Sequence, residues 1–309
     1  MRASFEMGTD TAEMRVAGRG RAPAVLVCAA VVLAGALVIV ARPLSAAAAS
    51  TRGRSHAHGI IARLARQAQD APVVTPGIQT SPNWSGYVVS DEGGSFNQVS
   101  AQWTQPPVTC STKNAWTLFW VGFDGWPSSE ATAYRSVEQG GTSAQCTNGV
   151  PTYSAFYEMW PTDAVQPLFP IKAGDQMEAS VVFLPGVDLS EGVFQINVTD
   201  ETSGQTTTKL ESCDTAAGLA CPRISAEWVA ESPSHFGTKK WYPLADYGTV
   251  NFQDATATDA EGQTGPISSS DWLASGIWRV DGMNKPLAKV SGLETSGSAS
   301  AFSDTWKRR

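Results

Sequence analysis

From Asn83 onward, apolar and polar residues alternate with a period of two in short segments separated by turn-forming residues. This period places successive side chains on opposite faces of a β-strand, while clusters of Gly, Asp, Asn and Pro mark the turns. The segments of strand length are Ser100–Gln105, Thr117–Phe123, Tyr153–Trp160, Met177–Phe183, Phe194–Thr199, Ala226–Ala230, Thr249–Phe252 and Gly276–Val280. No segment shows sustained helical periodicity, so the sequence predicts an all-β fold, one antiparallel β-sandwich. The stretch from Phe194 through Gly204 to Leu210 predicts a polar hairpin at a sheet edge.

The N-terminal region has a different pattern. Residues 22–41 carry no charge, follow Arg15, Arg19 and Arg21, and precede the small residues of 45–50. A basic segment, an apolar core and a small-residue site are typical of a secretory signal peptide, which we place at residues 1–49. The alternative is an uncleaved membrane anchor, because 20 apolar residues can span a bilayer. Either interpretation puts the rest of the chain outside the cytoplasm, and we expect a secreted protein.

Three further segments follow. Residues 50–80 contain arginines, histidines and prolines, and predict a basic linker or a propeptide. A basic propeptide could dock on an acidic domain by charge, whereas a linker would be a solvated spacer. The β-sandwich domain is placed at residues 81–303, and residues 304–309 are expected to form a basic C-terminal tail.

The charge distribution excludes one class of partner. The whole chain has a net charge of −7, but residues 80–309 hold 13 basic and 25 acidic side chains. Nucleic-acid binding requires Lys and Arg to neutralise phosphates, so we expect no nucleic-acid partner. We expect contact with a membrane only through an uncleaved signal segment. Nothing in the sequence indicates oligomerisation, and a monomer is expected.

Four cysteines remain after removal of the signal segment: Cys110, Cys146, Cys213 and Cys221. An even number in an exported domain predicts two disulfides with three possible connectivities. We favour Cys213–Cys221, which closes a short loop, and therefore Cys110–Cys146. Their spacing does not match a zinc site, and no metal site is expected.

The available side chains exclude several kinds of catalysis. The exported domain contains one histidine, His235, in a polar segment, and no G-x-S-x-G or H-E-x-x-H motif occurs. Neither Asp-Thr-Gly nor Asp-Ser-Gly is present, and the disulfides leave no free thiol. Carboxylate and amide chemistry on a β scaffold remains.

Two segments offer such chemistry. In one, Glu138 and Gln139 are followed by Gly140 and Gly141, and glycine lets a backbone approach a ligand closely. In the other, Glu227 lies in a strand-like segment between small and aromatic residues, where burial could shift its pKa. On pattern alone, a strand Glu is more often solvent-facing.

Together these segments resemble a known family. The motifs that carry the resemblance occur in order as Asn83-Trp84-Ser85-Gly86, Trp120-Val121-Gly122-Phe123-Asp124-Gly125, Gln139-Gly140-Gly141, Tyr153-Ser154-Ala155-Phe156-Tyr157-Glu158-Met159-Trp160-Pro161, Ala226-Glu227-Trp228-Val229 and Tyr247-Gly248-Thr249-Val250-Asn251-Phe252. Their spacing is similar to that of the glutamic peptidases, also called eqolisins, in the bacterial branch. The resemblance covers about residues 83–290.

The resemblance implies two antiparallel sheets packed as in a legume lectin, a concanavalin-like sandwich. It also implies an endopeptidase that acts on polypeptides with a catalytic Glu/Gln pair and no cofactor. The catalytic residues fall on Glu227 and Gln139. The substrate-binding positions fall on Trp84, Trp120, Asp124, Gly141, Tyr157 and Glu158. Ser154 departs from the pattern, because fungal members commonly carry an acid there.

We considered three alternative functions. Eleven Trp residues on a β-sandwich could form a carbohydrate-binding platform, which would need exposed Trp side chains in a row. A glycosidase would need a second carboxylate facing Glu227, with Asp124 or Glu158 as candidates. The third alternative is an inactive relative that serves as an adhesive or inhibitory domain, against which the presence of both Gln139 and Glu227 argues.

Overall fold

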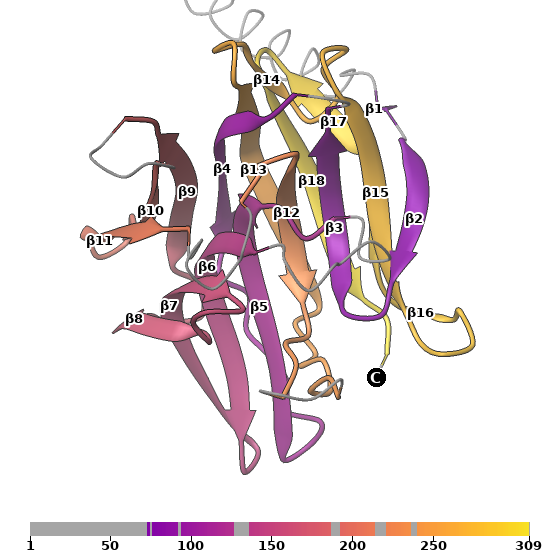
Figure 1. Cartoon of the computed structure of the whole chain (residues 1–309). Coiled ribbons are helices and arrows are strands. Elements are labelled where there is room, and N and C mark those ends of the chain that lie inside the picture. Colours follow the sequence, from indigo (N-terminus) through magenta and orange to yellow (C-terminus); the bar gives the residue numbers. More distant parts are fainter. Residues whose placement is uncertain are drawn as a thin grey trace, which may run out of the picture. The chain divides into compact units, whose positions relative to one another are not determined.

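A computed structural model of the chain describes residues 73–74, 76–91, 94–126, 136–186, 192–213, 221–235 and 240–308. The expected signal peptide at residues 1–49 lies outside the described residues, as does most of the segment 50–80. Every regular element in the described part is a β-strand (Figure 1). Within those residues, no helix has the length and apolar character needed to cross a bilayer.

The strands form two sheets that can be followed in Figure 1. The first sheet has the order β2–β15–β3–β12–β5–β6–β7–β8. All its pairings are antiparallel except that of β2 with β15, which is parallel. The strands of this sheet are β2 (Gly77–Ser81), β15 (Leu273–Val280), β3 (Trp84–Ser90), β12 (Ser225–Glu231), β5 (Asn114–Phe123), β6 (Val137–Thr147), β7 (Val150–Trp160) and β8 (Gln166–Pro170).

The second sheet has the order β1–β17–β18–β13–β4–β9–β10–β11, all antiparallel. β14 extends β13, and β16 pairs with both β15 and β18, so it connects the two sheets. The bounds are β1 (Val73–Val74), β17 (Leu293–Ser296), β18 (Ala299–Trp306), β13 (Thr249–Asp259), β4 (Phe96–Thr104), β9 (Gln176–Leu184), β10 (Val193–Asp200), β11 (Gln205–Ser212), β14 (Thr264–Pro266) and β16 (Pro286–Val290).

The core lies between the sheets and is built largely from aromatic side chains. Tyr87, Phe119 and Trp228 of the first sheet and Trp103 and Phe252 of the second belong to one buried cluster. These side chains alternate along their strands with residues on the opposite face, as the period of two requires. The all-β sandwich prediction is therefore confirmed. The predicted polar hairpin is β10–β11, with β11 at the edge of the second sheet.

The outer face of the first sheet carries a second apolar cluster. It includes Trp84, Leu118, Trp120, Phe156 and Val229. Along each strand, the outward-facing residues are separated by an even number of positions, as alternation requires. The central strands of the first sheet, β3, β12, β5 and β6, are therefore buried on both faces. Two disulfides, Cys110–Cys146 and Cys213–Cys221, have the favoured connectivity.

The structure corrects two domain boundaries. The segment expected to be a linker at residues 50–80 contributes β1 and β2, because backbone pairing with β17 and β15 extends both sheets. The expected tail at residues 304–309 begins inside β18, where the Asp304 side chain is buried and accepts a hydrogen bond from the Tyr247 hydroxyl.

Candidate active site

Four residues form a row across the outer face of the first sheet. Gln139 of β6 pairs with Glu158 of β7 on one side and with Gly122 of β5 on the other. Gly122 in turn pairs with Glu227 of β12. Neighbouring strands are ~4.8 Å apart, so the Cα atoms of Gln139 and Glu227 are about 9.5 Å apart with one strand between them. The pairing register therefore brings Gln139 and Glu227, 88 positions apart in the sequence numbering, to one place.

Gly122 contributes no side chain between Gln139 and Glu227. A Cβ atom at this position would stand 2.5 Å from the Glu138 carbonyl oxygen and 3.0 Å from Gln139 Cβ. It would also stand 3.1 Å from Cζ3 of Trp120. The β6 backbone and the Trp120 ring therefore already pack against Gly122, and a larger residue would force one of them to move.

The amide of Gln139 is oriented by a neighbouring carboxyl group. Gln139 Nε2 donates a hydrogen bond of 2.9 Å to Glu158 Oε2, and both side chains are buried. An amide nitrogen carries two N–H bonds, so one donor remains for another acceptor. Burial, followed by the charge of Glu231, raises the pKa of Glu158 well above its ordinary value.

Glu227 is fully buried, and its carboxyl oxygens make no hydrogen bond with any residue that the structure describes. Burial raises the pKa of Glu227 well above its usual range, because the charged form loses its hydration. The nearby Ser225 hydroxyl lowers this pKa, while the charges of Asp124 and Glu138 raise it further. The result is a carboxyl group that binds a proton more tightly than one in water.

A further glutamate on the same face was not among the sequence candidates. Glu231 Oε2 accepts a 2.9 Å hydrogen bond from Trp120 Nε1, and its Oε1 accepts one of 3.2 Å from Asn83 Nδ2. Burial raises the pKa of Glu231 to about 7. The Trp84 and Trp120 rings meet edge to face, with centroids 5.0 Å apart. The sequence signal for Glu231 is its spacing, since residues four apart on a strand face the same way.

Asp124 lies behind this face and acts on the backbone. Its side chain is fully buried, and its two carboxylate oxygens accept hydrogen bonds of 2.8 Å and 3.0 Å from the amides of Arg223 and Ile224. These two residues lead into β12, so Asp124 positions the start of the strand that carries Glu227. Both of its carboxylate oxygens are thus engaged by backbone amides.

Three other sequence candidates, Tyr157, Gly141 and Glu138, lie outside the row of four residues. Tyr157 packs against the core on the face opposite Glu158, near Lys209 of β11, and is not brought to the row. Gly141 pairs with Trp120, where the Phe119 carbonyl oxygen would stand 2.0 Å from any Cβ atom. Glu138 pairs with core-facing Phe123 and lies on the face away from Gln139, as alternation requires.

No group of three or more His, Cys, Asp or Glu side chains in the described part of the chain is arranged to hold a metal ion. The site therefore consists of carboxyl and amide groups bordered by indole rings.

Comparison with known families identifies the class of this fold and site. The model of the Peptidase A4 family matches residues 82–296, which is most of the chain. The protein therefore belongs to the Peptidase A4 family and is a peptidase, a peptide-bond hydrolase.

One curated relative and two solved structures show the extent of the similarity. Aspergillopepsin-2 of Aspergillus niger is 25% identical over 216 residues, which cover 63% of this chain and 71% of the relative. A Scytalido-glutamic peptidase, solved with a peptide-based transition state analog, superposes with a TM-score of 0.56 at 23% identity. SCP-B, described as a member of the eqolisin family and solved with the tripeptide Ala-Ile-His, gives a TM-score of 0.54 at 24% identity. Each of these matches covers 74% of this chain and 99% of the solved chain, and supports the shared sandwich fold.

Proposed function

We propose that the protein is a secreted endopeptidase that hydrolyses peptide bonds with the pair Glu227 and Gln139. The observation that carries this proposal is the pairing of both residues with Gly122, which brings a carboxyl group and an amide donor to one place on the sheet. A peptide bond bound beside this pair would have a proton acceptor on one side and a hydrogen-bond donor on the other.

The reaction would begin with ionised Glu227 as a general base. It takes a proton from a water molecule, whose oxygen attacks the scissile carbonyl carbon. The negative charge that develops on the carbonyl oxygen is stabilised by the N–H of Gln139 that does not bind Glu158, as in an oxyanion hole. Protonated Glu227 then gives its proton to the leaving nitrogen, the C–N bond breaks, and the carboxylate is restored.

Burial of Glu227 suits this double role. A raised pKa makes the ionised group a stronger base and the protonated group a ready donor near the same pH. The reference pKa of Glu is ~4.3, so the raised value moves the best compromise toward mild acid. We therefore propose acid operation, with an activity limb that rises with pH as Glu227 ionises.

Two of the alternative functions, a glycosidase and a carbohydrate-binding module, gain no support. Glu158 is three strands from Glu227, and its carboxyl group accepts a hydrogen bond from Gln139, which lies between them in the row. A glycosidase would instead need this carboxyl group to face Glu227. The second candidate, Asp124, has its carboxylate oxygens occupied by two backbone amides. Among described residues, the exposed Trp side chains are Trp160 and Trp241, one at the end of β7 and one after β12, so no exposed row forms.

Secretion, the monomeric state and the bacterial branch of the family belong to the same proposal. Two disulfides support an oxidising compartment outside the cytoplasm. The N-terminal apolar segment supports export, and the motif spacing supports the bacterial branch. A basic segment ahead of the domain could serve as a propeptide, and its removal is included in the test below.

The test is proteolysis of a denatured protein from pH 3 to pH 7, before and after removal of residues 50–72. Pepstatin and a metal chelator are added to exclude contaminating aspartic and metal peptidases. Cleavage that persists with both additives and is strongest in acid supports the proposal. Cleavage that pepstatin or the chelator abolishes, or no cleavage at any pH, would overturn it.

A further inference from the structure

A cleft lined by both apolar and polar groups lies at one end of the first sheet, beyond the row that carries Glu227. Its volume is about 480 Å³, within the usual range of ligand sites. Its lining includes Thr80 of β2, Pro82 just after that strand, Arg279 of β15, and Trp241 from the segment after β12. Trp241 is 38% exposed, so the cleft offers an aromatic surface as well as polar groups.

Arg279 is the unusual member of this lining. Its side chain is only 5% exposed, and its Nε donates a 3.1 Å hydrogen bond to the Pro82 carbonyl oxygen. Among the described residues this is its one hydrogen bond, and it forms no ion pair. A guanidinium has five N–H donors, and a buried charge without a partner is unfavourable unless an anion neutralises it. Four donors of Arg279 therefore remain for a ligand in the cleft.

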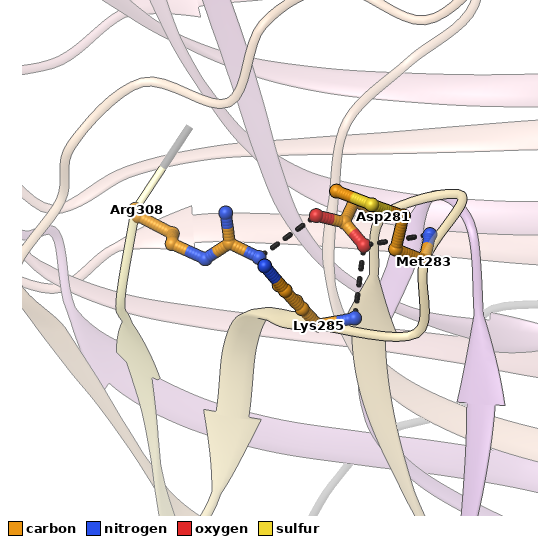
Figure 2. Close-up of polar contacts among 4 residues, drawn as sticks. All are labelled: Asp281, Met283, Lys285 and Arg308. Atoms are coloured by element: carbon orange, nitrogen blue, oxygen red, sulfur yellow. Dashed lines mark hydrogen bonds and ion pairs between the residues drawn. The ribbon is translucent and has the colours of Figure 1, made fainter.

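The acidic groups around Arg279 do not supply this partner. The Asp281 carboxylate accepts hydrogen bonds from the amides of Met283 and Lys285 and from Arg308 Nη2 at 2.8 Å (Figure 2). Glu231 is held by Trp120 and Asn83, and contributes to Arg279 only through its longer-range charge.

Burial lowers the pKa of Arg279 to about 10, so the side chain stays charged across the acid and neutral range. The charges of Tyr247 and Glu231 act in the opposite direction and raise this pKa. The cleft therefore keeps a fixed positive charge inside a strongly acidic domain.

The cleft shares its face with the Glu227 site. Ile277, two residues before Arg279 on β15, belongs to the same outer cluster as Val229 of β12. Glu231 pairs with Trp84, and Ile277 pairs with Gly86 two residues further along β3. Arg279 thus lies level with Glu231 and two strands away from it. Glu231 is itself four residues from Glu227 along β12. These steps give a Cα separation of ~16 Å from Glu227, about five residues of an extended peptide.

We propose that this cleft is a distal subsite for a carboxylate of the peptide substrate, bound by Arg279 about five residues from the scissile bond. The inference rests on the proposed peptidase function. Planar guanidinium groups match carboxylates with two parallel hydrogen bonds, which are stronger than neutral ones. The carboxylate can come from an Asp or Glu side chain or from the substrate C-terminus, and the cleft chemistry is the same for both.

Binding is measured at pH 5.5 on the Glu227→Gln protein, so that no probe is cleaved. Fluorescent N-acetylated hexapeptides of neutral sequence are compared as free acid and C-terminal amide. A second pair of amides carries Glu or Gln at the last position. We expect the acidic member of at least one pair to bind tenfold or more tightly, as charge-assisted hydrogen bonds provide. Which pair shows the preference identifies the source of the carboxylate. Equal binding within both pairs overturns the inference.

Variants then assign the preference to the cleft. Thr80→Glu adds a competing carboxylate to the lining of the cleft, whereas Thr80→Gln adds similar bulk without charge. We expect the first to abolish the acid preference and the second to retain it. Arg279→Gln should also abolish it, and Lys172→Gln, a charge change at an exposed loop position, should not. An acid preference that survives both Thr80→Glu and Arg279→Gln overturns the inference.

The inference and the proposed function fail separately. If the wild-type protein cleaves in acid but binds acid and neutral probes equally, only the subsite is wrong. If no cleavage occurs but the acid preference is present and depends on Arg279, the cleft binds carboxylates and the peptidase proposal is wrong. For an active enzyme, mass spectrometry of digests at pH 5.5 should show an acidic group enriched four to six residues from cleaved bonds. That enrichment should fade at pH 3, where substrate carboxyl groups with pKa values of ~4 are protonated.

Discussion

Gln139 and Glu227 lie on the two strands that flank β5, and both pair with the same residue, Gly122. This shared partner fixes their separation at two strand spacings and, as a glycine, adds no side chain of its own between them. The segment from Trp120 to Gly122 of β5 therefore sets the relative positions of the two reactive groups.

Replacing Gly122 tests whether glycine is needed between Gln139 and Glu227. A Cβ atom in Gly122→Ala would meet the Glu138 carbonyl oxygen at 2.5 Å, so the strand must shift. Overpacking of this kind costs ~1–3 kcal/mol, and we expect this loss in urea unfolding together with a larger relative loss in kcat/KM. Gly77→Ala is the control, because nothing lies within 4 Å of its Cβ position. Wild-type kcat/KM in Gly122→Ala would show that a glycine at this position is not needed for catalysis.

Removal of the amide tests the donor. Loss of one oxyanion-hole donor costs ~2.7–4 kcal/mol, so Gln139→Ala should lower kcat by about 10²–10³. Its thermal unfolding should remain close to wild type. Gln145→Ala, in the same strand and six residues along, should keep normal kcat. A full-rate Gln139→Ala enzyme would remove Gln139 from the mechanism.

The hydrogen bond from Gln139 to Glu158 predicts a positioning role for Glu158. In Glu158→Gln the side-chain carbonyl oxygen can still accept from Gln139 Nε2, so we expect most of kcat to remain. Glu158→Leu cannot accept and should lose roughly tenfold in kcat, the scale of one hydrogen bond. KM should change less than kcat, because the bond orients a donor used in the transition state. Equal kcat values for the two variants would contradict the role.

The buried carboxyl groups predict higher stability in acid. The pKa of Glu231 rises from 4.5 in the unfolded chain to about 7 in the fold, and that of Asp304 from 3.8 to about 6. In the window between each pair of values the folded state binds more protons, so stability falls as pH rises. The Glu231 shift alone corresponds to ~3 kcal/mol by pH 7.

We therefore expect a higher Tm at pH 4.5 than at pH 7.5. Glu231→Gln should flatten this dependence, since its amide remains neutral throughout. A Tm that rises from pH 4.5 to pH 7.5 would contradict the prediction, as would an unchanged slope in Glu231→Gln.

Alternation and apolar runs predicted strands in both sheets. Seven of the eight expected segments fall within observed strands, such as Phe194–Thr199 within β10, and Ser100–Gln105 extends one residue beyond β4, which ends at Thr104. β5 and β12 were recognised as apolar runs although both of their faces are buried. β3 and β6 are also buried on both faces, but they were not recognised, because glycines and polar residues interrupt their apolar runs. β2 was assigned to a linker because its residues are largely exposed and its pairing with β15 is a distant parallel contact.

The arrangement of the site could also be predicted only in part. Alternation alone predicts that Glu138 and Gln139 face opposite ways and that Glu231 shares a face with Glu227. The register across β6, β5 and β12 depends on long-range pairing, which a single sequence does not contain. The burial of Asp124 under two amides, and the position of Tyr157 behind the sheet, follow from that register and from the turn at Asp124 and Gly125.

The most direct test of the account compares two buried glutamates on opposite faces of the first sheet, Glu227 and Glu138. Each is changed to Gln, and cleavage of a denatured protein is followed in mild acid with pepstatin and chelator present. We predict that Glu227→Gln abolishes cleavage while retaining the fold, and that Glu138→Gln continues to cleave. Cleavage by Glu227→Gln at the wild-type rate would contradict the central claim.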